Sequence, residues 1–245
     1  MKRRAAAAWL ASMCLGACGG GGGGGAATTS STSGAEGPAS TATPAAATGP
    51  AIPPPTTPNI ALWGDSLVPP VYRALQPLSS DRVVFDGGVA GETSAQIAAR
   101  QAADTRHRDW INVFWYGHND IRVDHTTASA RIKADLAASV ARLTPGNNRF
   151  LILSVINNAD TPRGSDRYNT IVQLNADLAA AYPQNFFDIR AFMVAQANPV
   201  IGQQAAELAA DLPSSVLRFD EIHFTGFGAD IVARRLKQVL ESRGW

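Results

Sequence analysis

Asn59-Ile60-Ala61-Leu62-Trp63-Gly64-Asp65-Ser66-Leu67 is the stretch that decides the fold, because an apolar run stops at a glycine and an acid and a serine follow at once. A short apolar run bounded by such a turn predicts a buried β-strand over residues 60–63. A strand that ends in a tight turn exposes the next side chain, which places the serine hydroxyl for attack on a substrate. We therefore expect Ser66 to be a nucleophile, although a serine at this point alone is also a good helix N-cap.

Residues 1–58 carry export and tether signals and do not belong to a packed core. Basic residues at positions 2–4 precede an apolar stretch and then small residues that lead to a cysteine, which is the pattern of a secretory signal. The apolar run is shorter than the roughly 20 residues that a helix needs to span a bilayer. We therefore expect export without a permanent transmembrane helix.

The sequence Leu15-Gly16-Ala17-Cys18 resembles the lipobox of bacterial lipoproteins. The resemblance implies that residues 1–18 are a lipoprotein signal peptide and that a lipid on Cys18 anchors the exported protein to a membrane of the cell envelope. An ordinary secretory peptide with an incidental cysteine is the alternative. If the host is Gram-negative, Gly19 in place of an aspartate after the cysteine favours the outer membrane.

Residues 19–58 are rich in glycine, then in threonine, serine and alanine, and finally in proline. Such a composition buries too little apolar surface to offset the entropy of ordering, so it predicts a disordered tether. The remaining residues, 59–245, are enough for one compact domain with a sizeable core.

The charge of this domain is balanced. Three of the 21 basic residues and one of the 20 acidic residues precede residue 59, which leaves 18 basic and 19 acidic residues. The arginines are scattered, so the electrostatic footprint of a nucleic-acid-binding protein is missing. Cys14 and Cys18 are the only cysteines, which leaves the domain without disulfides or a cysteine nucleophile.

Strand-like and helix-like patterns alternate along the domain. The strands are apolar on both faces, as expected for a parallel sheet covered on two sides, so the alternation predicts an α/β fold with a mostly parallel sheet between two helix layers. Residues 190–219 are broken helical pieces that include a lid or a substrate-facing loop. We expect strands at 60–63, 82–85, 110–116, 150–156 and 186–189, and helices at 71–78, 94–103 with Ser94 as N-cap, 127–143, 171–182 and the C-terminal end.

Polar or glycine-rich clusters follow the first three predicted strands, at residues 64–66, 87–93 and 117–120, and a fourth at 220–223 precedes the last helix. Ligands of such sheets bind beyond the carboxyl ends of the strands, so we expect the four clusters to meet at one edge.

Ester cleavage by a serine needs a nucleophile, a base, an acid that orients the base, and donors for the developing oxyanion. Ser66, His223 and Asp220 are the candidates for the first three roles. The Asn119 side chain and glycine N–H groups are the candidate donors. Asp220 and His223 are three residues apart, so one turn of chain holds both.

This ordered set resembles the SGNH/GDSL hydrolase family. Its Gly-Asp-Ser-Leu block stands at 64–67, its second-block glycine at Gly91, its Gly-x-Asn-Asp block at 117–120 and its Asp-x-x-His block at 220–223. The resemblance covers residues 59–245 and implies a three-layer α/β/α sandwich with a flavodoxin-like sheet. It also implies an oxyanion hole formed by the backbone N–H groups of Ser66 and Gly91 and the Asn119 amide.

Several of these residues have simpler interpretations as well. Gly91 also serves as a turn glycine with positive φ, and Asn119 as a loop-capping amide. For His118 we expect either a contact with the substrate or a structural role. We expect the two other histidines, His107 and His125, to be solvated. The aspartates at 65 and 120 are expected to bind loop backbone.

The sequence therefore predicts a serine esterase that acts at or outside the cell envelope, on short-chain acyl or acetyl esters of small molecules or glycans. A lysophospholipase or lipase at the membrane surface is one alternative, and a catalytically inactive carbohydrate-binding lipoprotein is another. No His/Asp/Glu cluster has metal-ligand spacing, so neither a metal nor another cofactor is expected. We expect a monomer.

Overall fold

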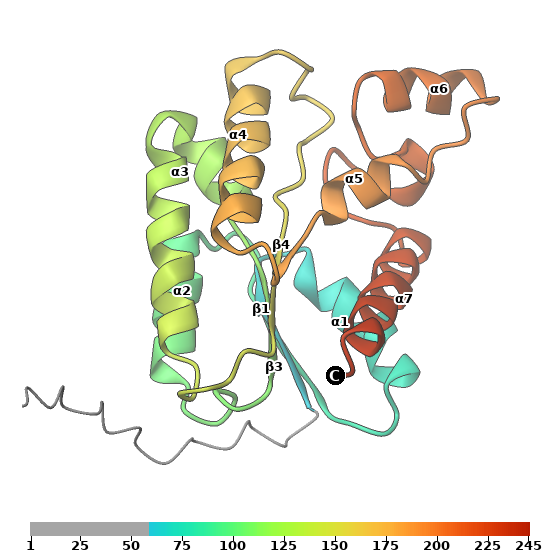
Figure 1. The fold of residues 1–245 in the computed structure, drawn as a ribbon. Helices are drawn as coiled ribbons and strands as arrows, with labels where there is room; N and C mark the ends of the chain where they lie inside the picture. The colour runs from blue at the N-terminus through green and yellow to red at the C-terminus, as the bar shows by residue number, and fades with distance from the viewer. Residues whose placement is uncertain (1–58) are drawn as a thin grey trace, which may run out of the picture. The chain divides into compact units, whose positions relative to one another are not determined.

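The computed structural model describes residues 59–245; the predicted signal peptide, Cys18 and tether lie outside the described residues. Five parallel strands form one sheet in the order β2-β1-β3-β4-β5 (Figure 1). The strands are β1 (Ile60–Gly64), β2 (Val84–Gly88), β3 (Ile111–Trp115), β4 (Phe150–Leu153) and β5 (Phe186–Phe187). This order is that of a flavodoxin-like sheet, in which ligands bind where the strand order reverses, between β1 and β3.

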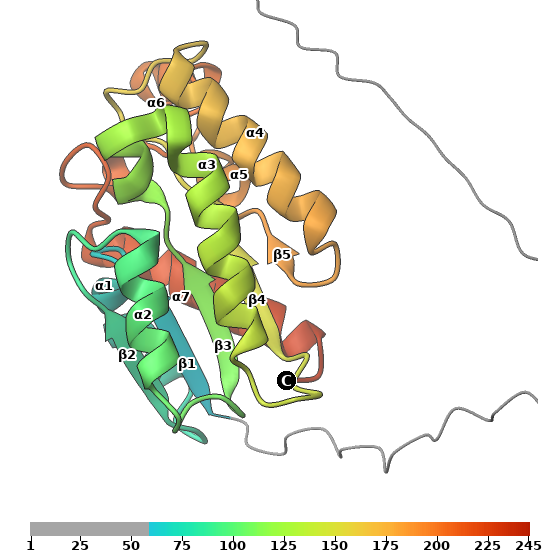
Figure 2. The ribbon, with the colours of Figure 1, turned by 90° about the vertical axis from the view of Figure 1, so that its left-hand side faces the viewer.

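Helices cover both faces of the sheet, as Figures 1 and 2 show. One layer contains α1 (Val68–Leu78), α5 (Ile189–Val194) and α7 (Gly226–Ser242), and the other contains α2 (Ser94–Ala103), α3 (His118–Ala141) and α4 (Asp166–Ala181). The helix α6 (Gly202–Ala209) and the 3₁₀ turn η1 (Ser215–Leu217) lie between α5 and α7 along the chain. No helix in residues 59–245 is both long and apolar enough to cross a membrane.

The side chains of each strand point alternately to the two faces of the sheet, and this divides the apolar core into two clusters. Leu62 of β1 belongs to the core cluster that contains residues of α1 and α7, whereas its neighbour Trp63 belongs to the cluster that contains residues of α2, α3 and α4. Since successive side chains of a strand point to opposite faces, an unbroken apolar strand fills both layers. The predicted α/β/α sandwich with a parallel sheet is confirmed.

Several element boundaries differ from the prediction, and three of the differences lie beside the predicted polar clusters. β2 continues through Gly87 and Gly88, which were expected to end it, and a Cβ at Gly87 would lie 2.5 Å from the Leu62 carbonyl oxygen. The N-cap of α2 is Thr93, because Gln96 accepts its backbone N–H, and not Ser94, which lies inside the helix. α3 begins nine residues before the expected position 127 and is interrupted at Asp124, where the backbone is non-helical (φ −155°, ψ 90°).

Candidate active site

The turn after β1 presents Ser66 at the carboxyl edge of the sheet. β1 ends at Gly64, a position that only glycine fits, because a Cβ there would lie 2.3 Å from the Trp115 carbonyl oxygen on the neighbouring strand. Asp65 is buried and accepts the backbone N–H of Leu67 at 3.1 Å, which closes the turn. The prolines in the first turn of α1 cost no hydrogen bond, since N–H groups there have no partner within the helix. Ser66 is thus held just before a helix start.

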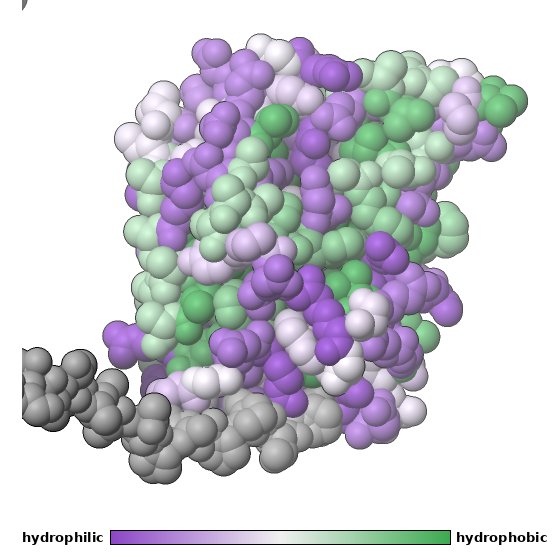
Figure 3. Space-filling view, in the orientation of Figure 1, coloured by the Kyte–Doolittle hydropathy of each residue, from purple (hydrophilic) through white to green (hydrophobic). Residues whose placement is uncertain are grey.

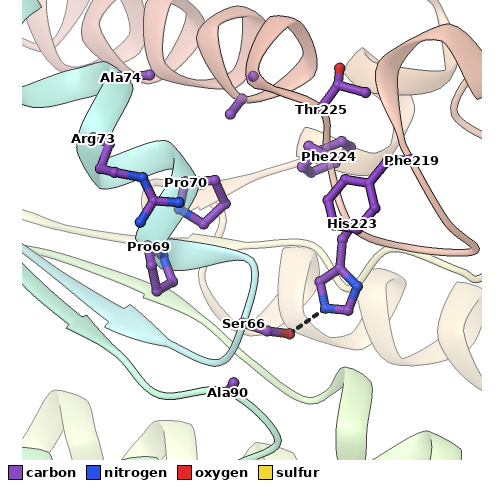
Figure 4. A pocket seen from close by; sticks show the side chains of 12 residues that line it. Ser66, Pro69, Pro70, Arg73, Ala74, Ala90, Phe219, His223, Phe224 and Thr225 are labelled. Carbon is purple, nitrogen blue, oxygen red and sulfur yellow. Dashed lines mark hydrogen bonds between the residues drawn. The ribbon is translucent and has the colours of Figure 1, made fainter.

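Ser66, His223 and Asp220 form one hydrogen-bonded chain. The Ser66 hydroxyl donates to Nε2 of His223 at 2.8 Å (Figure 4), and Nδ1 of His223 donates to Oδ2 of Asp220 at 2.7 Å. The contact with Asp220 assigns the ring proton to Nδ1, which leaves Nε2 free to accept the serine proton. Residues that are 157 positions apart along the chain therefore meet in the order that a nucleophile, a base and an orienting acid require.

The Asp220 carboxylate is held ionised. Burial opposes its charge, but hydrogen bonds from the backbone N–H groups of Ile222 and His223 and from the His223 ring outweigh burial and lower the pKa of Asp220 to about 2. The same two backbone bonds wrap the chain around the carboxylate and fix its second oxygen toward the imidazole. Asp220 thus stays an acceptor over the whole neutral range.

Ser66, Gly91 and Asn119, the residues of the predicted oxyanion hole, all line the same part of the cleft. Within residues 59–245, no hydrogen bond uses the backbone N–H of Ser66 or of Gly91. Gly91 has φ +81°, the left-handed conformation that favours glycine. The Asn119 amide donates to the Glu92 carbonyl oxygen at 2.9 Å and to Oδ2 of Asp65 at 3.4 Å. The contact with Asp65 is long for an N–H···O bond, so the Glu92 carbonyl oxygen is the stronger partner of this amide.

A partly buried cluster that sequence patterns did not reveal supports the loop of Gly91. Arg100 of α2 forms an ion pair with Glu92 at 2.7 Å and donates to the Gly87 carbonyl oxygen at 2.9 Å. Its guanidinium also lies over the Trp63 ring, 5.9 Å from the centroid. The side chain after Gly91 is therefore tied to both β1 and β2. Only proximity in three dimensions shows this role, because Arg100 belongs to an otherwise ordinary polar helix face.

A second cluster supports the segment of Asp220. Arg218 donates to the backbone carbonyl oxygens of Asp220, at 2.9 Å, and of Pro213, at 3.0 Å. Its guanidinium also lies 3.5 Å from the carboxylate of Glu207 on α6, and both side chains are largely buried. The sequence showed only broken helical pieces here, whereas the structure shows that α6 braces the loop that carries the acid and the base.

The site opens into two lobes that share Ser66, Ala90 and His223. The apolar lobe has a volume of about 560 Å³ and is drawn in Figure 4; its other lining residues include Pro69, Pro70, Ala74, Phe219, Phe224 and Ala229, with Arg73 beside them. The polar lobe has a volume of about 620 Å³; its other lining residues include His118, Asn119, Arg122, Asn158, Asp220 and Glu221. An ester bound at Ser66 thus has an apolar and a polar side available to its two halves.

Two aromatic residues, Phe219 and Phe224, line the apolar lobe. Phe219 is 71% exposed and its ring stacks on the His223 imidazole, with centroids 5.8 Å apart. Phe224 lines the same lobe from the core side. Phe192 and Met193, in contrast, pack into the core beside α7.

The other histidines lie in three different environments. The expectation that His107 is solvated was wrong: the ring is 7% exposed, stacks on Phe85 with centroids 4.0 Å apart, and approaches Oδ2 of Asp104 at 2.9 Å. His125 is half-buried on α3 and lines neither lobe. His118 lines the polar lobe. Within residues 59–245 no group of three or more His, Cys, Asp and Glu side chains could hold a metal ion.

The aspartates beside the predicted blocks bind backbone, as expected. Asp120 accepts the Ser94 backbone N–H at 2.8 Å and its hydroxyl at 2.8 Å, which joins α3 to the start of α2. Burial raises the pKa of Asp65 to about 6, and the N–H of Leu67 and the nearby His223 only partly oppose this rise.

The sequence matches no protein-family model and no curated protein, but many solved structures have the same fold. An acetyl xylan esterase, AlAXEase, superposes with a TM-score of 0.58 at 15% identity, covering 74% of this chain and 98% of the esterase. A GDSL-like lipase from Bacteroides thetaiotaomicron gives 0.56 at 20% identity, with 76% and 88% covered. A gut microbial diltiazem-metabolizing enzyme gives 0.55 at 16% identity; 76% of this chain aligns, but it spans only 47% of that enzyme. The resemblance carried by the four sequence blocks is thus confirmed for the fold, which this chain shares with GDSL-type lipases and esterases.

Proposed function

We propose that this protein is a serine esterase that cleaves carboxylic esters through an acyl-enzyme. The observation that carries the proposal is the hydrogen-bonded chain from Ser66 through His223 to Asp220, which opens into a cleft beside unpaired N–H groups. The esterase and lipase named among the similar structures support the same reaction class.

The geometry supports the following steps. The Ser66 oxygen attacks the ester carbonyl carbon while His223 Nε2 takes the hydroxyl proton, and the negative charge on the carbonyl oxygen is stabilised by the N–H groups of Ser66 and Gly91 and the Asn119 amide. The bond to the alcohol oxygen then breaks as His223 returns the proton to that oxygen. Water, deprotonated by His223, attacks the acyl carbon, and the acid leaves as Ser66 regains its proton.

Within this class we propose short-chain acyl or acetyl esters of small molecules or glycans as the substrates. The named acetyl xylan esterase supports this choice. A series of p-nitrophenyl esters of increasing chain length, assayed beside acetylated sugars, tests it, because an acetyl esterase prefers the short chains and removes sugar acetates.

The reaction class is tested at Ser66. Replacing Ser66 by Ala removes the nucleophile, so hydrolysis of p-nitrophenyl acetate should disappear while the circular dichroism spectrum stays that of the wild type. A fluorophosphonate probe should label the wild-type protein at Ser66 and leave the Ala variant unlabelled. Retained esterase activity in Ser66→Ala, or no labelling of the wild type, would reject the proposal; the second result favours a binding protein without activity.

A lipase acting at a membrane surface is the second candidate, and exposed apolar side chains favour it. Val200 is 89% exposed and Ile201 48% exposed, and Figure 3 shows hydrophobic residues gathered over α6 and its connection to α5. A preference for long acyl chains, with a rate that increases on phospholipid vesicles, would select this candidate over the acetyl esterase.

We further propose that the protein is a monomeric lipoprotein of the cell envelope, anchored through Cys18 and placed in the outer membrane if the host is Gram-negative. The lipobox-like sequence supports the anchor, and the tether would let the domain work away from the membrane. Mass spectrometry of the mature N-terminus tests the proposal: an unacylated N-terminus, or one that begins elsewhere, would refute it.

A further inference from the structure

Two side chains at the start of α3 face the polar lobe from one side. His118 is the first residue of the helix and Arg122 follows one turn later, and both line the lobe. Residues four apart on a helix lie on the same face. Among residues 59–245, the Arg122 guanidinium forms no hydrogen bond or ion pair, and the residue is exposed. A donor without a protein partner therefore stands beside the imidazole.

The imidazole of His118 is neutral at physiological pH. Burial lowers the pKa of His118 to about 4; its hydrogen bond to the Ile156 carbonyl oxygen opposes this, while the charges of Arg122 and His223 add to it. The positive end of the helix dipole acts in the same direction. A neutral imidazole has one N–H donor and one bare nitrogen, which is a hydrogen-bond acceptor. His118 thus offers the ligand a lone pair and no charge.

The remaining wall of the lobe adds a second acceptor. Glu221 is exposed and lines the lobe, and its carboxylate has no partner among the described residues. The neighbouring acid, Asp220, is occupied by His223, and Arg218 by Glu207 and backbone. An anion in this lobe would face two carboxylates and a lone pair, and a cation would face Arg122. A hydroxyl group both donates and accepts, so it fits all of these groups at once.

We infer that the polar lobe binds the alcohol half of the ester and recognises free hydroxyl groups on it through His118, Arg122 and Glu221. The inference rests on the proposed esterase function. The acyl half, a hydrocarbon chain without donors, fits the apolar lobe lined by Pro69, Pro70 and Phe224. The substrates are thus esters of a polyol, either a sugar or glycerol.

Matched pairs of substrates test this with the wild-type protein. Monoacetylglycerol is compared with propyl acetate, which has the same carbon skeleton without hydroxyls, and a monoacetylated methyl xyloside with its dideoxy analogue. We expect kcat/KM to be about 5- to 30-fold higher for the hydroxylated member of at least one pair, since one or two hydrogen bonds of about 1 kcal/mol each separate the two. The pair with the larger ratio distinguishes glycerol from sugar. Ratios near one in both pairs would overturn the inference.

Substitutions then test which side chains produce the ratio of kcat/KM between the hydroxylated substrate and its analogue without hydroxyls. In His118→Leu and in Arg122→Met, which lose the acceptor and the donor, we expect the ratio to fall by about 3- to 10-fold. His118→Gln keeps a carbonyl acceptor and should retain most of the ratio. His125→Leu and Arg142→Met remove the same side-chain types from α3 and its C-cap, outside both lobes, and should keep the wild-type ratio. Equal losses on both members of each pair would show a structural role and contradict the inference.

A binding measurement separates this inference from the proposed function. Ser66→Ala should bind the monoacetylated xyloside or monoacetylglycerol, and the double variant Ser66→Ala/His118→Leu should bind it about 3- to 10-fold more weakly in isothermal titration calorimetry. A wild-type protein that binds the polyol acetate but hydrolyses neither it nor p-nitrophenyl acetate would reject the esterase and keep the recognition site. A protein that hydrolyses p-nitrophenyl acetate but shows no preference for hydroxylated substrates would support the esterase and reject the recognition site.

Discussion

At the scale of single residues, the chemistry of this site depends on where each proton is held. The bond from Nδ1 of His223 to Asp220 leaves Nε2 bare, and Ser66 fills that position. Asp65, one residue before the nucleophile, is 1% exposed and has a raised pKa instead of a lowered one. The pKa values of Asp220 and Asp65 thus shift in opposite directions, although both carboxyls lie near the His223 imidazole. Backbone N–H groups stabilise the charge on Asp220, whereas burial disfavours the charge on Asp65.

Replacing Asp220 by Asn should lower kcat by about 10³- to 10⁴-fold, which is the size of effect known for the serine-protease triad that serves as the general template. The amide would donate where the carboxylate accepts, so the imidazole proton would move to Nε2 and block deprotonation of Ser66. The measurement is kcat for p-nitrophenyl acetate, with an unchanged melting temperature as the control for folding. An effect below tenfold would show that Asp220 does not set the tautomer.

Asp65 should make the protein less stable as pH rises. Because burial raises its pKa from 3.8 to about 6, the folded state binds the proton more tightly than the unfolded state does. The stabilisation is complete below pH 3.8 and is lost as the pH rises through about 6, in total about 3 kcal/mol. Urea unfolding from pH 4 to pH 7 should show this loss in the wild type.

Asp65→Asn removes the titrating group and keeps an oxygen for the Leu67 N–H. The difference in unfolding free energy between the variant and the wild type should therefore shift by about 2 kcal/mol in favour of the variant from pH 4 to pH 7, since part of the total is already lost at pH 4. A constant difference across this range would show that Asp65 has an ordinary pKa.

At the scale of elements, the ends of the strands decide the site, and these ends were the hardest feature to predict. Apolar runs showed where the strands lie, because burial on both faces demands them. The runs did not show that β2 includes Gly87 and Gly88, since that depends on close contact with β1. The prediction that His107 is solvated failed for a similar reason. Its aromatic partner Phe85 is distant in sequence, so no local pattern shows that the two rings stack.

Gly91 and Gly164 form a matched pair for testing the loop after β2. Both have positive φ, +81° and +85°, and neither would bring a new Cβ within 4 Å of another atom. An alanine at either position should cost about 1–2 kcal/mol of stability. Only Gly91→Ala should also lower kcat, by up to about 10²-fold, because its N–H belongs to the proposed oxyanion hole. Equal kcat values in the two variants would remove Gly91 from the oxyanion hole.

Arg218 joins Glu207 of α6 to the loop that carries Asp220 and His223, so its loss should lower both the stability and kcat. Arg218→Met leaves the Glu207 carboxylate largely buried without its cation, which should cost about 3 kcal/mol of stability and lower kcat through Asp220. Adding Glu207→Gln removes the uncompensated charge and should restore part of the stability but not the kcat. Thermal unfolding and p-nitrophenyl acetate kinetics of the two variants measure this; full recovery of kcat would show that Arg218 does not position Asp220.

At the scale of the whole molecule, the parallel sheet brings distant segments to one edge. Because every strand runs in the same direction, the residues after β1, β2 and β3 meet at the carboxyl edge of the sheet. The segment before α7 adds the acid and the base to the same site. Because the charges of residues 59–245 nearly balance, the net charge of the domain does not attract charged partners over long distances.

A chain that begins at Asn59 should fold alone and hydrolyse p-nitrophenyl acetate with the kcat/KM of the full chain, because both core clusters and both lobes lie within it. Asn59 belongs to the domain: its carbonyl oxygen accepts the Ile111 N–H at 2.8 Å and its Oδ1 accepts the Val83 N–H at 2.9 Å. Asn59→Ala in this shorter chain should lower the unfolding free energy by about 1 kcal/mol. Failure of the shorter chain to unfold cooperatively would contradict the domain boundary.

The sequence by itself determined the fold class, the position of each strand and the four segments of the site, because apolar periodicity and the spacing of glycine, aspartate, serine and histidine are properties of neighbouring residues. Tertiary structure alone decided which side chains support these segments and which side chains line the two lobes of the cleft. Arg100, Arg218 and His118 acquire their roles from partners on other elements, and the pKa values of Asp65 and His118 depend on burial. Contacts and desolvation arise only when the chain packs, so no local pattern encodes them.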